Sequence, residues 1–124
     1  TKMTGVNHKG AFIGTSIIPG VMMGLNALSD GTAQLPKISL EMPNGVIAKN
    51  TADCMRSGVL FGNASMIDGM IERYEEVLGE KASVVATGGY AALVTPLCKR
   101  GMELDSDLVL EGLRIIFNKN QKNA

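Results

Sequence analysis

A short apolar run that leads into two glycines is the part of this chain best suited to chemistry. Residues 83–87 are typical of a buried strand, and Gly88-Gly89 predicts a tight turn before a helix that starts near Tyr90. Glycine lets the backbone adopt positive φ and approach a ligand closely. The first N–H groups of the helix can then bind an anion. Thr87, Gly88 and Gly89 therefore form a candidate nucleotide site, with a strand-to-helix connection that binds nothing as the alternative.

A second polar cluster, Lys49-Asn50-Thr51, comes directly before the longest amphipathic stretch. The side-chain oxygen of Asn50 or Thr51 can cap the helix that follows, because it can accept a free backbone N–H. The Lys49 ammonium suits a phosphate or a carboxylate, and a solvated lysine is the alternative. With one histidine and no Cys-x-x-Cys pair, the sequence predicts no metal site in this chain.

Composition limits the class of protein. The chain has 124 residues, of which 45% are hydrophobic and 19% charged, which predicts one domain with an apolar core. The twelve basic and twelve acidic residues cancel, so we expect no nucleic-acid partner. No run reaches the roughly 18 apolar residues of a membrane span, so we expect no membrane partner. Cys54 and Cys98 are expected to be reduced thiols, which is typical of a cytoplasmic protein.

Hydrophobic periodicity and turn residues predict an α/β chain. The expected elements are strands over 2–6 and 11–18, a helix over 21–28, an extended segment over 35–40, a helix over 51–78, a strand over 83–87, and helices over 90–100 and 107–118. Gly58 and Gly62 give the long helix a small-residue face that suits close packing of another backbone. The segment from Asn118 is expected to fray. The solvated face of the long helix is expected to carry Glu72, Arg73, Glu75 and Glu76.

Several blocks of this sequence, taken in order, resemble the C-terminal half of type III pantothenate kinase. They follow the family's order and spacing across nearly the whole chain. No single block identifies the family, but the blocks together are specific to it. The blocks are Gly14-Thr15-Ser16-Ile17-Ile18-Pro19-Gly20, Thr32-Ala33-Gln34-Leu35-Pro36, Lys49-Asn50-Thr51, Ser57-Gly58, Ile67-Asp68-Gly69, Ala86-Thr87-Gly88-Gly89 and Leu110-Glu111-Gly112-Leu113.

The resemblance implies an α/β (α+β) domain with the ribonuclease H-like fold shared by acetate and sugar kinases, actin and heat-shock ATPases. It implies a transferase that phosphorylates pantothenate with ATP, the first step of coenzyme A biosynthesis. It also implies a homodimer that uses a divalent metal such as Mg²⁺ and a monovalent cation such as K⁺. By the same resemblance, Asn50 and Thr51 bind pantothenate, and Thr87, Gly88 and Gly89 approach the nucleotide. Helix capping is the alternative role for Thr51.

Two positions depart from the family's pattern. Gly14-Thr15 stands where the family usually has Gly-Gly, and Ala48 stands where it usually has glycine before Lys-Asn-Thr. Each places a side chain beside backbone that glycine would leave free for positive φ or close approach. The departures fit either harmless variation or weakened substrate binding. They keep open a non-catalytic relative that acts as an accessory transcriptional regulator, and a third interpretation is an oligomeric scaffold built on the 51–78 helix.

The family's phosphate-binding loop, its catalytic aspartate block and the strand with a cation ligand have no counterpart in residues 1–124. We therefore expect one truncated C-terminal kinase domain without an N-terminal domain, with no catalytic residue of its own and no activity alone. The absent strand would lie between the 1–18 hairpin and the 83–87 strand, which leaves unpaired strand edges. A separate N-terminal fragment or a non-native oligomer is expected to fill this gap.

Overall fold

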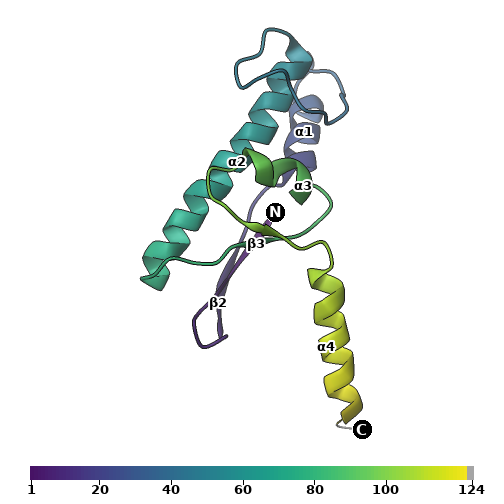
Figure 1. Ribbon diagram of the computed structural model, residues 1–124. Helices are drawn as coiled ribbons and strands as arrows, with labels where there is room; N and C mark the ends of the chain where they lie inside the picture. Colours follow the sequence, from purple (N-terminus) through teal and green to yellow (C-terminus); the bar gives the residue numbers. More distant parts are fainter. Residues whose placement is uncertain (123–124) are drawn as a thin grey trace.

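The computed structural model describes residues 1–122. Helix α2 (Thr51–Leu78) is the longest element, and α1 (Val21–Asp30) packs beside its N-terminal half (Figure 1). A β-hairpin projects below these helices, and α4 (Leu108–Lys122) extends away from the rest of the chain. This mixture of helices and small sheets confirms the predicted α/β class.

The hairpin consists of β1 (Lys2–Val6) and β2 (Phe12–Ile17), which pair antiparallel as predicted. Gly5 lies opposite Gly14 while Val6 lies opposite Phe12, so Ile13 is the extra residue of a β-bulge. The turn between the strands is held by Asn7, whose side-chain oxygen accepts the backbone N–H groups of Lys9 and Ala11, both at 3.0 Å. Local turn chemistry therefore sets the hairpin.

A second, separate sheet joins β3 (Val85–Ala86) to β4 (Glu103–Leu104) in parallel. The predicted buried strand over 83–87 is wrong in both length and burial: it has two residues, and Val85 is 47% exposed. The reason is that β4 is short and pairs with only one edge of β3. The extended segment predicted over 35–40 forms no strand in the described structure, since no strand pairs with it.

The helix predicted over 90–100 is also wrong in extent. It starts as expected after Tyr90, but α3 (Ala91–Val94) is followed by the short 3₁₀ helix η1 (Thr95–Leu97). Pro96 lacks a backbone N–H, so it cannot donate the hydrogen bond that would continue the α-helix, although Thr95 before it keeps helical backbone angles. The next backbone N–H groups, of Lys99 and Arg100, donate to the Asp68 carboxylate on α2 at 2.8 and 2.9 Å.

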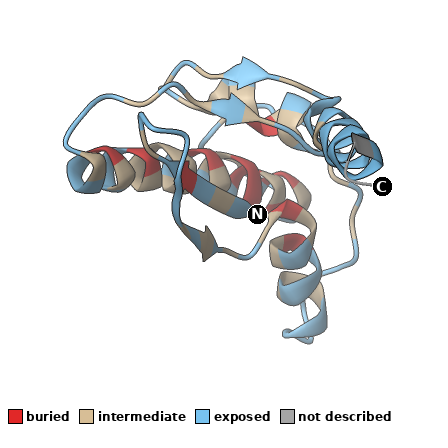
Figure 2. Cartoon of the chain, turned by 90° about the horizontal axis from the view of Figure 1, so that it is seen from below, coloured by how far each residue is buried: buried red, intermediate tan, exposed pale blue. Residues whose placement is uncertain are grey.

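The core lies between α1, α2 and α3. Figure 2 shows the buried residues gathered along one side of α2 and on α1. Leu25 and Leu60 are the largest side chains that are fully enclosed. The amphipathic pattern that predicted this helix places Met55, Val59 and Ile71 on its buried side, while Ile67, Met70, Tyr74 and Leu78 of the same pattern are partly buried. The core cluster comprises Val21, Leu25, Met55, Val59, Leu60, Ala64 and Val94.

Three expectations about the surfaces of the helices are corrected. Glu75 is only 7% exposed rather than solvated, because Arg100 and Lys81 pair with its carboxylate. Residues 118–122 stay helical to the end of α4 rather than fraying, and the last two residues of that predicted segment lie outside the described residues. A Cβ at Gly58 or Gly62 would meet nothing within 4 Å, so no described residue packs on that face. Among residues 1–122, no helix is both long and apolar enough to cross a membrane.

Candidate functional site

The start of α2 is organised by Asn50. This residue has extended backbone geometry, and its side-chain oxygen accepts the Asp53 backbone N–H at 2.9 Å. Its carbonyl accepts the Cys54 N–H at 2.9 Å. Asn50 is therefore the N-cap, which settles the alternative that the sequence left open. Thr51 is the first helical residue and is exposed, and its hydroxyl has no hydrogen-bond partner within residues 1–122.

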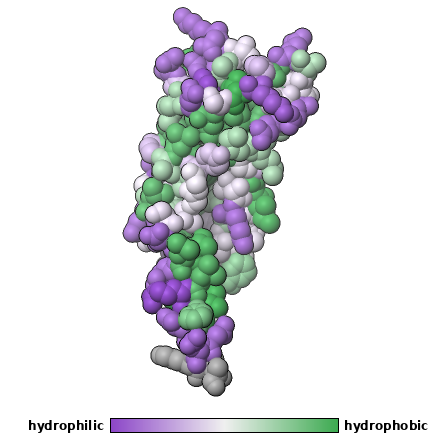
Figure 3. Space-filling model, turned by 90° about the vertical axis from the view of Figure 1, so that its right-hand side faces the viewer, coloured by the Kyte–Doolittle hydropathy of each residue, from purple (hydrophilic) through white to green (hydrophobic). Residues whose placement is uncertain are grey.

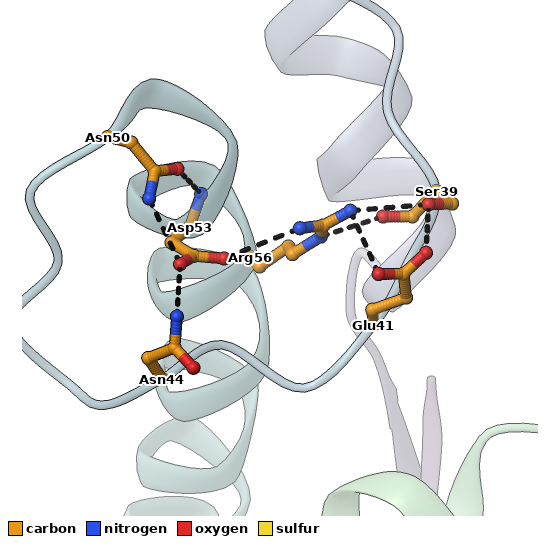
Figure 4. A network of polar contacts seen from close by, with 6 residues as sticks. All are labelled: Ser39, Glu41, Asn44, Asn50, Asp53 and Arg56. Atoms are coloured by element: carbon orange, nitrogen blue, oxygen red, sulfur yellow. Dashed lines mark hydrogen bonds and ion pairs between the residues drawn. The ribbon is translucent and has the colours of Figure 1, made fainter.

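The Asp53 carboxylate collects three donors at the same end of α2 (Figure 4). The side-chain amides of Asn50 and Asn44 each donate to Oδ2 at 3.1 Å, and the Arg56 guanidinium donates to Oδ1 at 3.3 Å. The residue is 8% exposed. The hydrogen bond from Asn50 and those from Arg56 and Asn44 lower the pKa of Asp53 against the opposing effect of burial, so the carboxylate is charged at neutral pH.

Arg56 extends this network to the loop that precedes α2. Its Nε donates to the Ser39 carbonyl at 3.0 Å and one terminal nitrogen donates to the Ser39 hydroxyl at 3.2 Å. The same nitrogen lies 3.4 Å from the Glu41 carboxylate. The 39–50 loop is thus attached to α2 at both of its ends.

The predicted site residues did not include Asn44, Asp53 or Arg56. Two local signals could have found part of this network. Asp53 is three residues after the N-cap, where a carboxylate favours the helix start, and Arg56 follows it at a spacing that places both on one helix face. The contact from Asn44 depends on the path of the loop, which has no local sequence signal.

An open depression lies beside Asn50 and Thr51, with a volume of about 520 Å³, which is within the range of about 300–1,000 Å³ for small-molecule sites. Apolar side chains from α1, the loop and α2 line one part of it, and polar groups from the start of α2 line the other. This combination suits a small molecule with both apolar and anionic parts. The lining residues are Leu28, Leu35, Lys49, Asn50, Thr51, Cys54, Met55 and Gly58.

The second predicted site, the turn at Thr87, Gly88 and Gly89, is exposed between β3 and α3. Gly88 has a φ of +112°, the conformation for which glycine was predicted here. A Cβ at Gly88 or Gly89 would meet nothing within 4 Å, so the backbone has room for a ligand. None of the three residues lines the depression at α2, so this chain does not bring its two predicted sites into one pocket.

Neither departure from the family's pattern strains the backbone. Thr15 lies in β2, where its hydroxyl donates to the Met3 carbonyl at 2.7 Å. The Ala48 carbonyl accepts a hydrogen bond from the Cys54 thiol at 3.4 Å. No residue other than glycine has positive φ among residues 1–122, so a side chain fits at both positions without a conformational penalty.

The described residues contain no group of three or more His, Cys, Asp or Glu side chains placed to hold a metal ion. We therefore assign no metal ligand to this part of the chain. The two cysteines are free thiols, Cys54 exposed and Cys98 partly buried. Burial and the nearby Asp68 raise the pKa of the Cys98 thiol, so it is protonated at neutral pH.

Comparisons with known proteins point in one direction. Residues 1–73 match the sequence profile of a family described as type III pantothenate kinase. The type III pantothenate kinase of Rhodococcus erythropolis is 42% identical over 120 residues, which cover 94% of this chain and 44% of that protein. The enzyme of the same name from Syntrophobacter fumaroxidans is 40% identical over 119 residues, or 95% of this chain and 46% of the relative. The chain thus spans somewhat less than half the length of these relatives.

Proposed function

This chain belongs to the type III pantothenate kinase family, and from that premise we propose that it is part of an ATP-dependent kinase that converts pantothenate to 4'-phosphopantothenate in coenzyme A biosynthesis. The observation that carries the proposal is the identity of 42% across 94% of the chain with an enzyme of that name. Such identity spread over nearly the whole chain, rather than over one motif, supports a shared activity of the complete proteins.

We assign pantothenate to the depression at the start of α2. Pantothenate has a carboxylate and hydroxyl groups, which suit the polar part of this lining. It also has a carbon that carries two methyl groups, which suits the apolar part. The Thr51 hydroxyl has no partner within residues 1–122, and the unbonded N–H groups at the start of the helix, of Thr51 and Ala52, favour an anion. Asn50 contributes its side-chain amide while it caps α2. Lys49 adds a positive charge at the rim.

We assign the nucleotide to the turn at Thr87, Gly88 and Gly89. The open space beside both glycines supports close approach of a phosphate or a ribose to the backbone. ATP supplies the phosphoryl group when it is bound, and the chain's own contribution is to orient it. We assign no catalytic residue to this chain, and we propose that the ligands of a divalent metal and of a monovalent cation come from polypeptide beyond it.

We propose that this chain is the C-terminal domain of the ribonuclease H-like kinase fold, completed by further polypeptide. Its two sheets are separate, and a strand between β1 and β3 would join them. The apolar face of α4 has no cover within residues 1–122, which supports a further packing partner. We also propose a homodimer, which the exposed Gly58 and Gly62 face would suit, and a cytoplasmic location, which the free thiols support.

A joined enzyme tests this function. The chain is fused to the part of the Rhodococcus erythropolis relative that the match leaves uncovered, and 4'-phosphopantothenate is detected by mass spectrometry. We expect ATP-dependent turnover from the joined enzyme and none from the 124-residue chain alone. A folded joined enzyme without turnover, beside an active intact relative, would overturn the kinase proposal and favour a non-catalytic relative.

Substitutions of Thr51 test the substrate site in the same enzyme. Thr51→Val removes the hydroxyl and keeps the shape, so we expect the KM for pantothenate to rise about tenfold. Thr51→Ser keeps the hydroxyl and should stay near the original value. Ser65→Ala removes an exposed hydroxyl from the middle of α2 and serves as the control. Equal KM values for all of these variants would remove Thr51 from the substrate site.

A further inference from the structure

We propose that Asp53 is a positioning residue for the pantothenate site, because its carboxylate holds Asn50 and the 39–50 loop in the arrangement that binds substrate. The inference rests on the proposed function, since it concerns the same depression at the start of α2. Asp53 does not itself line that depression. It acts through residues that do.

The first contribution of Asp53 is to fix the side chain of Asn50. Both ends of the Asn50 amide bind Asp53: the oxygen accepts the backbone N–H at 2.9 Å, and the nitrogen donates to the carboxylate at 3.1 Å (Figure 4). An amide nitrogen carries two hydrogens, so one remains for a ligand. Because Asn50 lines the depression, Asp53 determines which way that donor faces.

The second contribution is to hold the loop that carries Lys49. No hydrogen bond joins backbone groups of residues 32–49 to other backbone groups in the described chain, so side chains must hold this segment. Asp53 binds it directly through Asn44 and indirectly through Arg56, which holds Ser39. Without the carboxylate, Asn44 and Arg56 lose a shared acceptor, so the loop is held less firmly relative to Thr51. The hydrogen bonds from Ser57 to the Val46 carbonyl and from Cys54 to the Ala48 carbonyl remain.

The negative charge of Asp53 makes its contacts with Arg56, Asn44 and Asn50 sensitive even to a substitution that keeps the side-chain volume. The Asp53 side chain is mostly buried and lies 3.3 Å from Arg56, whose own side chain is also largely enclosed. Removing the charge leaves a guanidinium whose remaining carboxylate partner is the more exposed Glu41. A neutral amide at position 53 also replaces one acceptor with a donor that would face the donor groups of Asn44 or Asn50. Asp53→Asn therefore disturbs the loop with almost no change of volume.

Glu75 provides a matched control on the same helix. Its exposure of 7% is close to the 8% of Asp53, and it too pairs with an arginine. It accepts the Ala82 backbone N–H, where Asp53 accepts side-chain amides. It lies near the other end of α2 and does not line the depression. Glu75→Gln should therefore destabilise the fold through the same kind of change without altering the proposed site.

The test compares Asp53→Asn with Glu75→Gln in the joined enzyme. We expect Asp53→Asn to raise the KM for pantothenate about tenfold, with the KM for ATP nearly unchanged. We expect Glu75→Gln to lower the melting temperature and to leave both KM values unchanged. If Asp53→Asn behaves like Glu75→Gln, Asp53 only stabilises the fold and the inference is overturned.

A milder variant keeps the test decisive if Asp53→Asn does not fold. Asn44→Ala leaves the Asn50 cap intact and removes one attachment of the loop, so we expect a rise of about threefold in the KM for pantothenate. Hydrogen exchange of peptides from residues 39–50 should accelerate in the same variant. Unchanged exchange and KM would overturn the inference.

The result for Thr51→Val separates the two proposals. If Thr51→Val raises the KM for pantothenate and the Asp53 and Asn44 variants do not, the substrate site stands and the positioning role fails. If Thr51→Val, Asp53→Asn and Asn44→Ala all leave the KM for pantothenate unchanged, the substrate site fails and the positioning role fails with it.

Discussion

Helices α2 and α4 are both amphipathic, yet they differ in what covers their apolar faces. Leu60 on α2 is completely buried, while Leu113 on α4 is 58% exposed. The cover on α2 comes from α1, α3 and adjoining segments of this chain. Figure 3 shows a strip of apolar surface on the part of the molecule that α4 forms. An apolar periodicity therefore predicts a helix and its inner face, but it does not predict which segment or chain covers that face.

The charged groups of the two helices differ in the same way. On α2, Asp53 and Glu75 are buried, and each binds residues outside the helix: Asp53 binds the preceding loop through Asn44, and Glu75 binds Ala82 and Arg100. On α4, Glu111 pairs within residues 1–122 only with Arg114 on the same helix, and both side chains are well exposed. An exposed pair of this kind contributes about 0–1 kcal/mol. Buried carboxylates tie distant segments together, whereas the pair on α4 acts locally.

The largest expected effect comes from matched leucine truncations. Leu60→Ala should lower the free energy of unfolding by about 2–5 kcal/mol, because it leaves a cavity in the core. Leu113→Ala should change it by less than about 0.5 kcal/mol, because the side chain is exposed. Urea denaturation of the 124-residue chain measures both values.

The same two variants, Leu60→Ala and Leu113→Ala, can be measured in the joined enzyme to find out whether added polypeptide covers α4. If added polypeptide covers α4, the effect of Leu113→Ala should rise toward that of Leu60→Ala. Equal effects in the separate chain would contradict the exposure of α4. A small effect of Leu113→Ala in both forms would remove the support that α4 gives to a further packing partner.

Two glycines on α2 should respond in opposite directions. Gly79 ends the helix with a φ of +74°, so Gly79→Ala should cost about 1–2 kcal/mol. Gly58→Ala should stabilise the free chain by up to about 1 kcal/mol, because alanine favours a helix and has open space there. Urea denaturation at low protein concentration gives both values.

Sedimentation then tests whether the small-residue face is an interface. If a second copy packs on it, Gly58→Ala should weaken dimer formation while it stabilises the monomer. Gly69→Ala, another helical glycine with open space beside it, is the control. Equal dimer affinities for all three proteins would contradict the packing role of Gly58.

Loss of the Asn50 cap should have an intermediate effect. Asn50→Ala should lower the free energy of unfolding by about 1 kcal/mol, because it removes the acceptor for a free N–H. Thr51→Val should change it by less than about 0.5 kcal/mol, since the Thr51 hydroxyl has no partner in the described chain. Thermal denaturation compares them, and a larger loss for Thr51→Val would show that the cap is misassigned.

The smallest effects concern pH. Hydrogen bonds and nearby cations lower the pKa of both Asp53 and Glu75 in the folded chain. A lowered pKa stabilises the fold above the ordinary carboxylate pKa, and this contribution is lost as the pH falls through the folded pKa. Stability should therefore decline from about pH 5 downward.

Variants locate the source of this decline. The combined Asp53→Asn and Glu75→Gln variant should show a flatter dependence of stability on pH than the original chain. Glu111→Gln on α4 should hardly alter the curve, although Arg114 lowers the pKa of Glu111, because solvent screens this exposed pair. A curve that Glu111→Gln flattens as much as the combined variant does would contradict the distinction between the two helices.

The elements that were predicted well are those with local signals at both ends. The hairpin has a turn at Asn7, and α2 starts after the Asn50 cap and ends at Gly79, as expected. The strand over 83–87 was predicted poorly because it depends on a distant partner, and β4 is short. The helix after Tyr90 ends early at Pro96, a local signal that the prediction over 90–100 did not use, and the Asp68 carboxylate on α2 then binds the Lys99 backbone N–H.

The sequence alone determined the α/β class, the position of Asn50 and Thr51 at the start of α2, and the glycines of the turn before α3. These features follow from neighbouring residues, through helix capping and the conformational freedom of glycine. Only the tertiary structure decided that Glu75 is buried and that Asn44 of the loop meets Asp53. Such contacts join segments whose approach depends on how the whole loop and helix pack, so no local pattern specifies them.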